Sequence, residues 1–210
     1  MCRILAVRSQ EGIDIVTHLE KLSNISKNSQ VFQGHGWGIS YYEKDKWKLY
    51  RNINPIWESD FSNLDKTKIF LAHARSAFQD EGIEIENNMP FLSNSLSFIF
   101  NGELRGVKIK ESGRIGAEKI FNYIQRFTHD NLVEGIDNAI AVINKRTEYI
   151  RALNFIISDG AKFYTKSQYN EEPDYFRLHK SISDDLVIIS SEVYSGYSWK
   201  KIHPGRVEVL

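Results

Sequence analysis

The order of apolar patterns along the 210-residue chain constrains its fold most. A strand-like segment at residues 3–8 is followed by residues 13–27, where apolar side chains recur every three or four positions, as on one face of a helix. Strand-like segments then fill much of residues 36–100, two helical patterns cover 116–128 and 131–144, and most of the remainder is again strand-like. This order predicts an α+β fold, with antiparallel sheets covered by helices on their outer faces.

Several local signals place individual strands and turns. Residues 44–46 separate the strand-like segments GWGISYYE and KWKLYRN and predict a hairpin turn, and KIFLAHARSAF at 68–78 predicts a further strand. Asp159-Gly160 predicts a two-residue hairpin after EYIRALNFIIS. The strands expected after it are AKFYTKS at 161–167, YFRLHK at 175–180, LVIISS at 186–191 and RVEVL at 206–210.

Length and composition exclude several classes of protein. A chain of this length predicts one domain over residues 1–210. Lys plus Arg equals Asp plus Glu at 27 each, so no net field favours nucleic acid or an acidic membrane, and a small polar substrate fits better. The longest apolar runs, such as 153–157, are too short to span a bilayer, which predicts no membrane segment. The N-terminus MCRILAV lacks the pattern of a secretory signal, which predicts a cytoplasmic protein. One cysteine excludes an internal disulfide and a multi-cysteine metal site, and we expect neither a metal nor a cofactor.

Cys2 is the first candidate for chemistry. Small second residues generally permit removal of the initiator methionine, so mature Cys2 would carry a thiol and a free α-amine on one residue. The α-amine has an ordinary pKa near 7.7–8.0, so at neutral pH it can act as the base for its own nucleophile. Taken alone the signal is weak, because any protein can have cysteine after its start methionine.

Asn101-Gly102 has two readings. Hydrolysis of an amide needs donors aimed at the oxygen that becomes negative, and this pair could supply a side-chain amide and a backbone N–H. The same dipeptide between SLSFIF and ELRGVKI is also the preferred type I′ hairpin turn, and local pattern favours the turn.

His73 and Arg75 are two residues apart in a strand-like segment, so they share one face. A planar guanidinium matches a carboxylate, so Arg75 could hold the carboxylate of an amino acid, and a surface salt bridge is the local alternative. Residues 34–38 pack three glycines around Trp37, which indicates close backbone approach beside an aromatic wall or a simple β-bulge.

Taken in order, Cys2, GHGWGISYY at 34–42, AHAR at 72–75, NNMPF at 87–91 and FNGEL at 100–104 resemble a class II glutamine amidotransferase domain of the short, stand-alone type. The later segments SSE at 190–192 and HPG at 203–205 are similar to the tail of that type. The resemblance implies the four-layer αββα sandwich of N-terminal-nucleophile hydrolases. It also implies that the terminal cysteine attacks the side-chain amide of glutamine through a thioester and releases ammonia.

The resemblance assigns roles to individual residues. Cys2 matches the nucleophile and base, Asn101 and Gly102 match the oxyanion hole, and Arg75 matches the arginine that holds the substrate carboxylate. Trp37 and Gly38 match the strand that lines the site, and we place His73 beside Arg75 among the substrate-binding residues.

Three positions depart from the family pattern. Phe78 stands where a threonine is expected, Gly116 stands where an acidic residue holds the α-ammonium of glutamine, and Met89 and Phe100 replace histidines of common motif forms. These departures leave the cleavage residues in place and alter the contacts to the amino acid.

The sequence therefore predicts an amidohydrolase of glutamine-amidotransferase type. Hydrolysis of γ-glutamyl amides or peptides is the second hypothesis, and a catalytically silent binding module is the third. No synthase domain is recognised in the sequence, so transfer of ammonia would need a separate ammonia-accepting synthase subunit as a partner.

Overall fold

Two antiparallel sheets form the centre of the computed structural model, which describes residues 1–64, 66–93, 95–129 and 131–210. The first sheet has the order β11-β9-β10-β1-β4-β2-β3, with β1 Arg3–Ile13, β2 Trp37–Glu43, β3 Lys46–Asn52, β4 Thr67–Ala74, β9 His179–Ile182, β10 Leu186–Ser190 and β11 Lys200–Lys201. The second has the order β12-β8-β7-β6-β5, with β5 Phe91–Ser93, β6 Leu96–Val107, β7 Thr147–Ser158, β8 Phe163–Lys166 and β12 Glu208–Val209.

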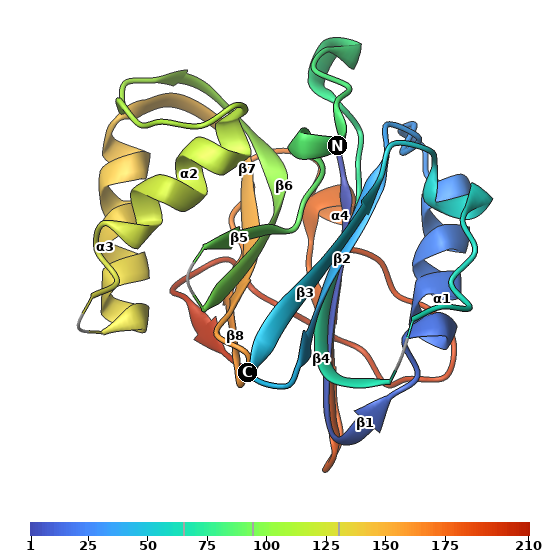
Figure 1. The fold of residues 1–210 in the computed structure, drawn as a ribbon. Coiled ribbons are helices and arrows are strands. Elements are labelled where there is room, and N and C mark those ends of the chain that lie inside the picture. The colour runs from blue at the N-terminus through green and yellow to red at the C-terminus, as the bar shows by residue number, and fades with distance from the viewer. Residues whose placement is uncertain (65, 94, 130) are drawn as a thin grey trace.

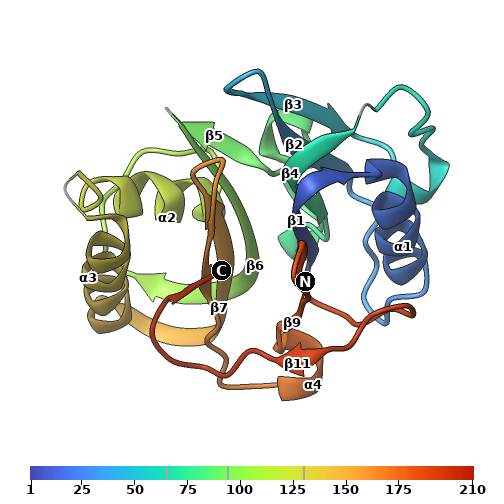
Figure 2. The ribbon, with the colours of Figure 1, turned by 90° about the horizontal axis from the view of Figure 1, so that it is seen from below.

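Helices cover the outer faces of the two sheets (Figure 1). The α-helices are α1 Ile15–Lys27, α2 Gly116–Gln125, α3 Leu132–Lys145 and α4 Pro173–Phe176, and short 3₁₀ helices lie at η1 Ile56–Glu58, η2 Phe78–Asp80 and η3 Ile85–Asn87. Figure 2 shows α1 on one side and α2 with α3 on the other, with both sheets between them. The predicted four-layer αββα arrangement is confirmed.

Alternation along the strands explains the layers. In β1, Leu5 and Val7 belong to the apolar cluster that includes Leu19 of α1, whereas Ile4 and Ala6 belong to the cluster of the second sheet. Successive strand side chains point to opposite faces, so one strand supplies both layers. In the outer layer of the second sheet, Phe98 of β6 stacks on Phe121 of α2, with ring centroids 4.8 Å apart.

The predicted helices are confirmed at 15–27, 116–125 and 132–145. Asp14 begins α1, because its Oδ1 accepts the N–H of Val16 at 3.1 Å. The predicted turn between β2 and β3 is also confirmed, with positive φ at Lys44 (49°) and Asp45 (60°), as a type I′ turn requires.

Three local predictions need correction. The segment 68–78 is a strand only to Ala74, because the chain leaves the sheet before η2. Residues 175–180 are not one strand: Pro173 begins the short helix α4, where its fixed φ suits the first helical turn, and β9 starts only at His179. The hairpin at Asp159-Gly160 forms with a longer connection, residues 159–162, in which Asp159 Oδ1 accepts the N–H groups of Ala161 and Lys162.

Within the described ranges, no helix is long and apolar enough to cross a membrane.

Candidate functional site

Cys2 lies immediately before β1, at the end of the first sheet where β4 finishes. Its partly buried Sγ is 3.5 Å from the backbone N of Ser76 and 3.6 Å from the carbonyl O of the same residue. The start of β1 is held by Ser191, whose Oγ accepts the N–H of Ile4 at 3.0 Å and whose own N–H donates to Ile4 O at 3.0 Å. The thiol is therefore fixed at a strand end beside the chain that follows β4.

Asn101 and Gly102 lie inside β6, where they pair with Asn154 and Leu153 of β7. The hairpin-turn reading of this dipeptide is wrong, because the antiparallel pairing with β7 continues on both sides of it. A Cβ on Gly102 would lie 2.2 Å from the carbonyl O of Ala152, so only glycine lets β7 approach this closely. Asn101 is fully buried, yet neither its Nδ2 nor its Oδ1 has a hydrogen-bond partner. A buried amide without a hydrogen-bond partner costs free energy. Such an unpaired amide is expected where a ligand completes the hydrogen bonds.

Arg75 follows β4 directly and is tied to the glycine-rich segment before β2. Its N–H donates to Gly36 O at 2.9 Å, and its carbonyl accepts the N–H of His35 at 3.1 Å. Burial lowers the pKa of the guanidinium, while the nearby charges of Cys2 and Glu84 act in the opposite direction. Its Nη1 is buried and has no partner, so a donor stays open for an acidic group.

A cavity of about 1310 Å³ joins these elements. Cys2, Arg75 and Gly102 all line it, together with Ser76 and residues of η2 and α2. The nucleophile candidate, the guanidinium and one backbone donor therefore face one space.

His73 lies on the face of β4 that carries Ile69 and Leu71, between the sheets. Burial and then the charge of Arg75 lower its pKa to about 3, so the ring stays neutral at physiological pH. His73 is fully buried and is absent from the described lining of the cavity. The expected proximity to Arg75 is present, but a direct contact of His73 with substrate has no support in the cavity.

Trp37 and Gly38 lie on opposite faces of the sheet, because neighbouring residues of a strand point to opposite sides. Trp37 packs with Ile39 in the cluster that contains α1, and its Nε1 donates to Ser59 Oγ at 2.7 Å. Its fully buried side chain lies on the outer face of the sheet, so the expectation that it contacts substrate is corrected. Gly38 is on the inner face, where an added Cβ would lie 2.5 Å from Met89 O, which makes it a packing position.

The three departures from the family pattern lie around the cavity. Phe78 is 59% exposed and lines it, as does Gly116, where an added Cβ would meet nothing within 4 Å. Glu118 and Glu103, two carboxylates that line the cavity or follow Gly116 closely, are paired with arginines. Glu118 binds Arg114 through Nε at 3.1 Å and Nη2 at 2.7 Å, and Glu103 binds Arg105 and Arg151.

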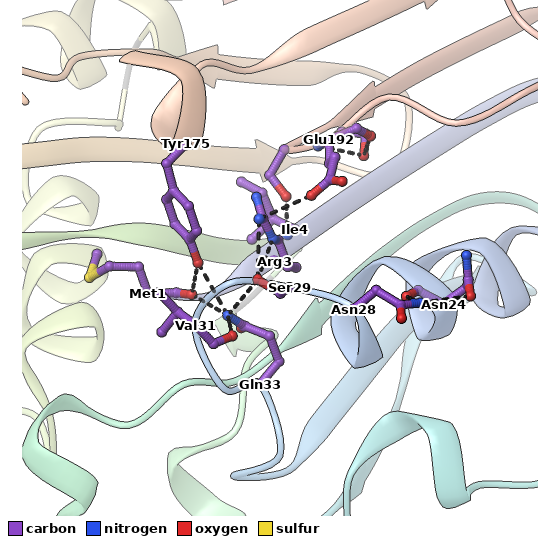
Figure 3. Close-up of polar contacts among 12 residues, drawn as sticks. Met1, Arg3, Ile4, Asn24, Asn28, Ser29, Val31, Gln33, Tyr175 and Glu192 are labelled. Carbon is purple, nitrogen blue, oxygen red and sulfur yellow. Dashed lines mark hydrogen bonds and ion pairs between the residues drawn. The ribbon is translucent and has the colours of Figure 1, made fainter. Parts of the chain in front are cut away.

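Sequence patterns missed Ser76, Gln33 and Tyr175. Ser76 touches the thiol, and Gln33 of the loop before β2 and Tyr175 of α4 reach the chain terminus (Figure 3). Tyr175 lies in the segment EEPDYF, which carries no motif, so only the three-dimensional structure brings it to Cys2. Among the described residues, no group of three or more His, Cys, Asp or Glu side chains could hold a metal ion.

A thiol next to the chain terminus, an αββα fold and an Asn-Gly pair in β6, of which Gly102 lines the cavity, define a candidate N-terminal-nucleophile hydrolase. The family model described as "Glutamine amidotransferases class-II" matches residues 1–172. The chain belongs to this family, whose general reaction is hydrolysis of the side-chain amide of glutamine.

Individual relatives agree with this membership. The chain is similar to the Escherichia coli (strain K12) protein named "Putative glutamine amidotransferase YafJ", with 24% identity over 98% of this chain and 96% of the relative. The fold of this chain is similar to that of a glutamine aminotransferase class-II domain protein of Silicibacter pomeroyi, with a TM-score of 0.68 and 18% identity over 99% of this chain and 94% of the Silicibacter chain. It is also similar to the glutamine phosphoribosylpyrophosphate amidotransferase of B. subtilis, with a TM-score of 0.70 and 18% identity over 100% of this chain. The chain spans about half (49%) of the length of that enzyme.

Proposed function

We propose that the chain hydrolyses the side-chain amide of glutamine, with Cys2 as the nucleophile after removal of Met1. The observation that carries this proposal is the convergence of Cys2, Arg75 and Gly102 on one cavity. The unpartnered donors of Arg75, which lines the cavity, and of Asn101, which precedes the lining residue Gly102 but is not itself in the described lining, support the same reading, because each is suited to one part of such a substrate.

The proposed reaction begins with proton transfer from the thiol of Cys2 to its own α-amine. The thiolate attacks the amide carbon, and the oxygen that becomes negative accepts hydrogen bonds from Asn101 Nδ2 and the N–H of Gly102. The α-ammonium returns its proton to the leaving nitrogen, ammonia departs, and a γ-glutamyl thioester stays on Cys2. Water then attacks the thioester, gives its proton to the amine, and releases glutamate.

Arg75 supplies binding rather than bond cleavage. Its open Nη1 and planar geometry suit a bidentate contact with the α-carboxylate of the substrate. Domains of this family often pair with synthase domains or subunits. We therefore include a separate ammonia-accepting subunit as a proposed partner.

A γ-glutamyl amide or peptide is the second candidate substrate. The cavity volume of about 1310 Å³ exceeds the roughly 300–1,000 Å³ common for small-molecule sites. One part of its lining is apolar and comes from β6, α2 and the segment before α2, including Leu104, Ile115, Ile120 and Tyr123. A site for glutamine alone needs neither this volume nor this surface.

The test is to incubate methionine-free protein with glutamine and a panel of γ-glutamyl amides and to follow ammonia, amine and glutamate. Release of ammonia from glutamine without any acceptor supports the first proposal, and faster release of an amine supports the second. Binding of these compounds without release of any product would support a silent binding module and contradict both.

A further inference from the structure

Gln33 and Tyr175 converge on the carbonyl oxygen of Met1 (Figure 3). Gln33 Nε2 donates to this oxygen at 2.6 Å and Tyr175 Oη donates to it at 2.5 Å. The two side chains also contact each other, with Gln33 Nε2 3.2 Å from Tyr175 Oη. Gln33 comes from the loop between α1 and β2 and Tyr175 from α4, so two separate parts of the chain meet at the peptide bond between Met1 and Cys2.

This position is the place where the mature α-amine forms. In a peptide group the carbonyl oxygen lies about 2.3 Å from the nitrogen of the next residue, given its standard bond lengths. When Met1 is removed, the nitrogen of Cys2 remains and the carbonyl that Gln33 and Tyr175 held is gone. The two polar side chains are then left around a nitrogen that has gained hydrogen-bond donors.

Gln33 already has an acceptor that lacks a donor. Its side chain is fully buried, and Oε1 has no hydrogen-bond partner, whereas Nε2 also donates to Val31 O at 2.8 Å. An unpaired buried amide oxygen costs free energy. The mature amine of Cys2 carries N–H groups, and these are donors of the kind that Oε1 lacks.

The surroundings keep Tyr175 in place and uncharged. The guanidinium of Arg3 lies over its ring at 4.3 Å and is itself fixed by Glu192 at 3.0 Å and by Ser29. Burial is the main cause that raises the pKa of Tyr175, so its phenol oxygen is a neutral acceptor and donor at physiological pH. The other charged or titratable groups that act on the chain terminus are Arg151, Glu103, the Cys2 thiol, His35 and His73.

We propose that Gln33 and Tyr175 are positioning residues that hold the α-amine of mature Cys2 through Oε1 and Oη. With its N–H groups held there, the amine directs its lone pair at Sγ and is stabilised as the ammonium once it has taken the thiol proton. This inference rests on the proposed role of Cys2 as nucleophile.

The test uses the fact that Cys2 is the only cysteine of the chain. Alkylation of the methionine-free protein by iodoacetamide, read by intact mass across a pH series, reports the coupled titration of the thiol and its amine. Intact mass before alkylation also shows that Met1 is absent from each variant. The assay needs no substrate, so its result stands apart from the release of ammonia that tests the proposed function.

Two variants give opposite shifts. Gln33→Glu places a carboxylate beside the amine, favours the ammonium, and should move the amine inflection to a pH higher by about 1. Tyr175→Phe keeps the ring under Arg3 and removes one acceptor of the ammonium, so the inflection should move to lower pH by about 0.5–1. In turnover, Tyr175→Phe should lower kcat about 2- to 10-fold and leave KM within about 2-fold.

Gln10→Glu and Tyr50→Phe are matched controls. Gln10 is exposed and lies eight residues after Cys2 along the chain, about 26 Å from it at the usual rise of a strand. Tyr50 is on β3. Both control profiles should coincide with that of the wild type. If folded Gln33→Glu and Tyr175→Phe proteins also coincide with the wild type, Gln33 and Tyr175 do not hold the amine and the inference is wrong. If Gln33→Glu fails to fold, the shift of Tyr175→Phe alone decides in the same way.

Discussion

Replacing Asn101 by alanine should remove activity while leaving the free energy of unfolding nearly unchanged. Asn101 and Asn154 pair across β6 and β7 and are both fully buried, but of the two side chains only that of Asn154 is hydrogen-bonded. Asn154 Nδ2 donates to Phe176 O at 2.8 Å, and its Oδ1 accepts the N–H of Gln168 at 3.0 Å. The two residues therefore allow a direct comparison between an asparagine proposed to bind a ligand, Asn101, and one that stabilises the fold, Asn154.

The magnitudes follow from these contacts. Asn101→Ala loses one oxyanion donor, so acylation should slow by roughly 10²–10³-fold. It breaks no hydrogen bond, and it removes two unpartnered buried atoms, so the free energy of unfolding should stay within about 1 kcal/mol. Asn154→Ala leaves two groups without partners at about 1–3 kcal/mol each. A total of about 2–6 kcal/mol would lower Tm by roughly 5–15 °C.

The assay combines single-turnover release of ammonia with thermal unfolding of both variants. Activity should fall far more in Asn101→Ala, and Tm should fall far more in Asn154→Ala. If Asn101→Ala unfolds at a much lower temperature and retains its acylation rate, Asn101 is a structural residue and the oxyanion assignment fails.

Three further predictions concern recognition and pH. Arg75→Ala should lower kcat/KM roughly 10- to 150-fold. Arg75→Lys should restore only part of the lost kcat/KM, since lysine offers a point charge in place of a planar fork. Equal kcat/KM in wild type and Arg75→Ala would exclude the carboxylate contact. Because Glu118 and Glu103 are already paired with arginines, kcat/KM for a des-amino glutamine should exceed that for a decarboxylated one, and the reverse order would indicate an unrecognised ammonium site. Burial lowers the pKa of His18 to about 4 from an ordinary value near 6.5, so the unfolded chain binds a proton first on acidification. Stability should therefore be fully present above pH 6.5 and fall by about 3 kcal/mol towards pH 4 from this residue; urea unfolding of His18→Gln should show a flatter pH profile, and parallel profiles would contradict this.

The periodicity of apolar residues was sufficient to predict the layers of the fold, because it depends directly on which face of each helix or strand is buried. The helix stripe of 13–27 became α1, and the alternation of Leu5 and Val7 with Ile4 and Ala6 set the two faces of β1. It was insufficient where the chain turns or bends. Tyr175 was expected in a strand, but the preceding Pro173 starts a helix there.

The site was predictable mainly through the order of motifs. Local pattern favoured a turn at Asn101-Gly102, and only long-range pairing with β7 keeps this dipeptide inside a strand. The motif around Trp37 predicted a strand that lines the site, but no residue of β2 is in the described lining of the cavity, and alternation sends Trp37 to the outer face and Gly38 to the inner one. The contact of Gln33 with Tyr175 joins positions 142 residues apart, and Tyr175 reaches Met1 across 174 residues, which no local signal records.

In the proposed reaction, Cys2 forms a covalent thioester with the acyl part of an amide substrate. The most direct measurement is the intact mass, followed by peptide mapping, of methionine-free protein quenched in acid during turnover of glutamine or of the best γ-glutamyl amide. We expect a mass increase of one γ-glutamyl group located on residue 2, and neither adduct nor turnover in Cys2→Ala. Undiminished turnover by folded Cys2→Ala, or full activity in protein that retains Met1, would contradict this proposal.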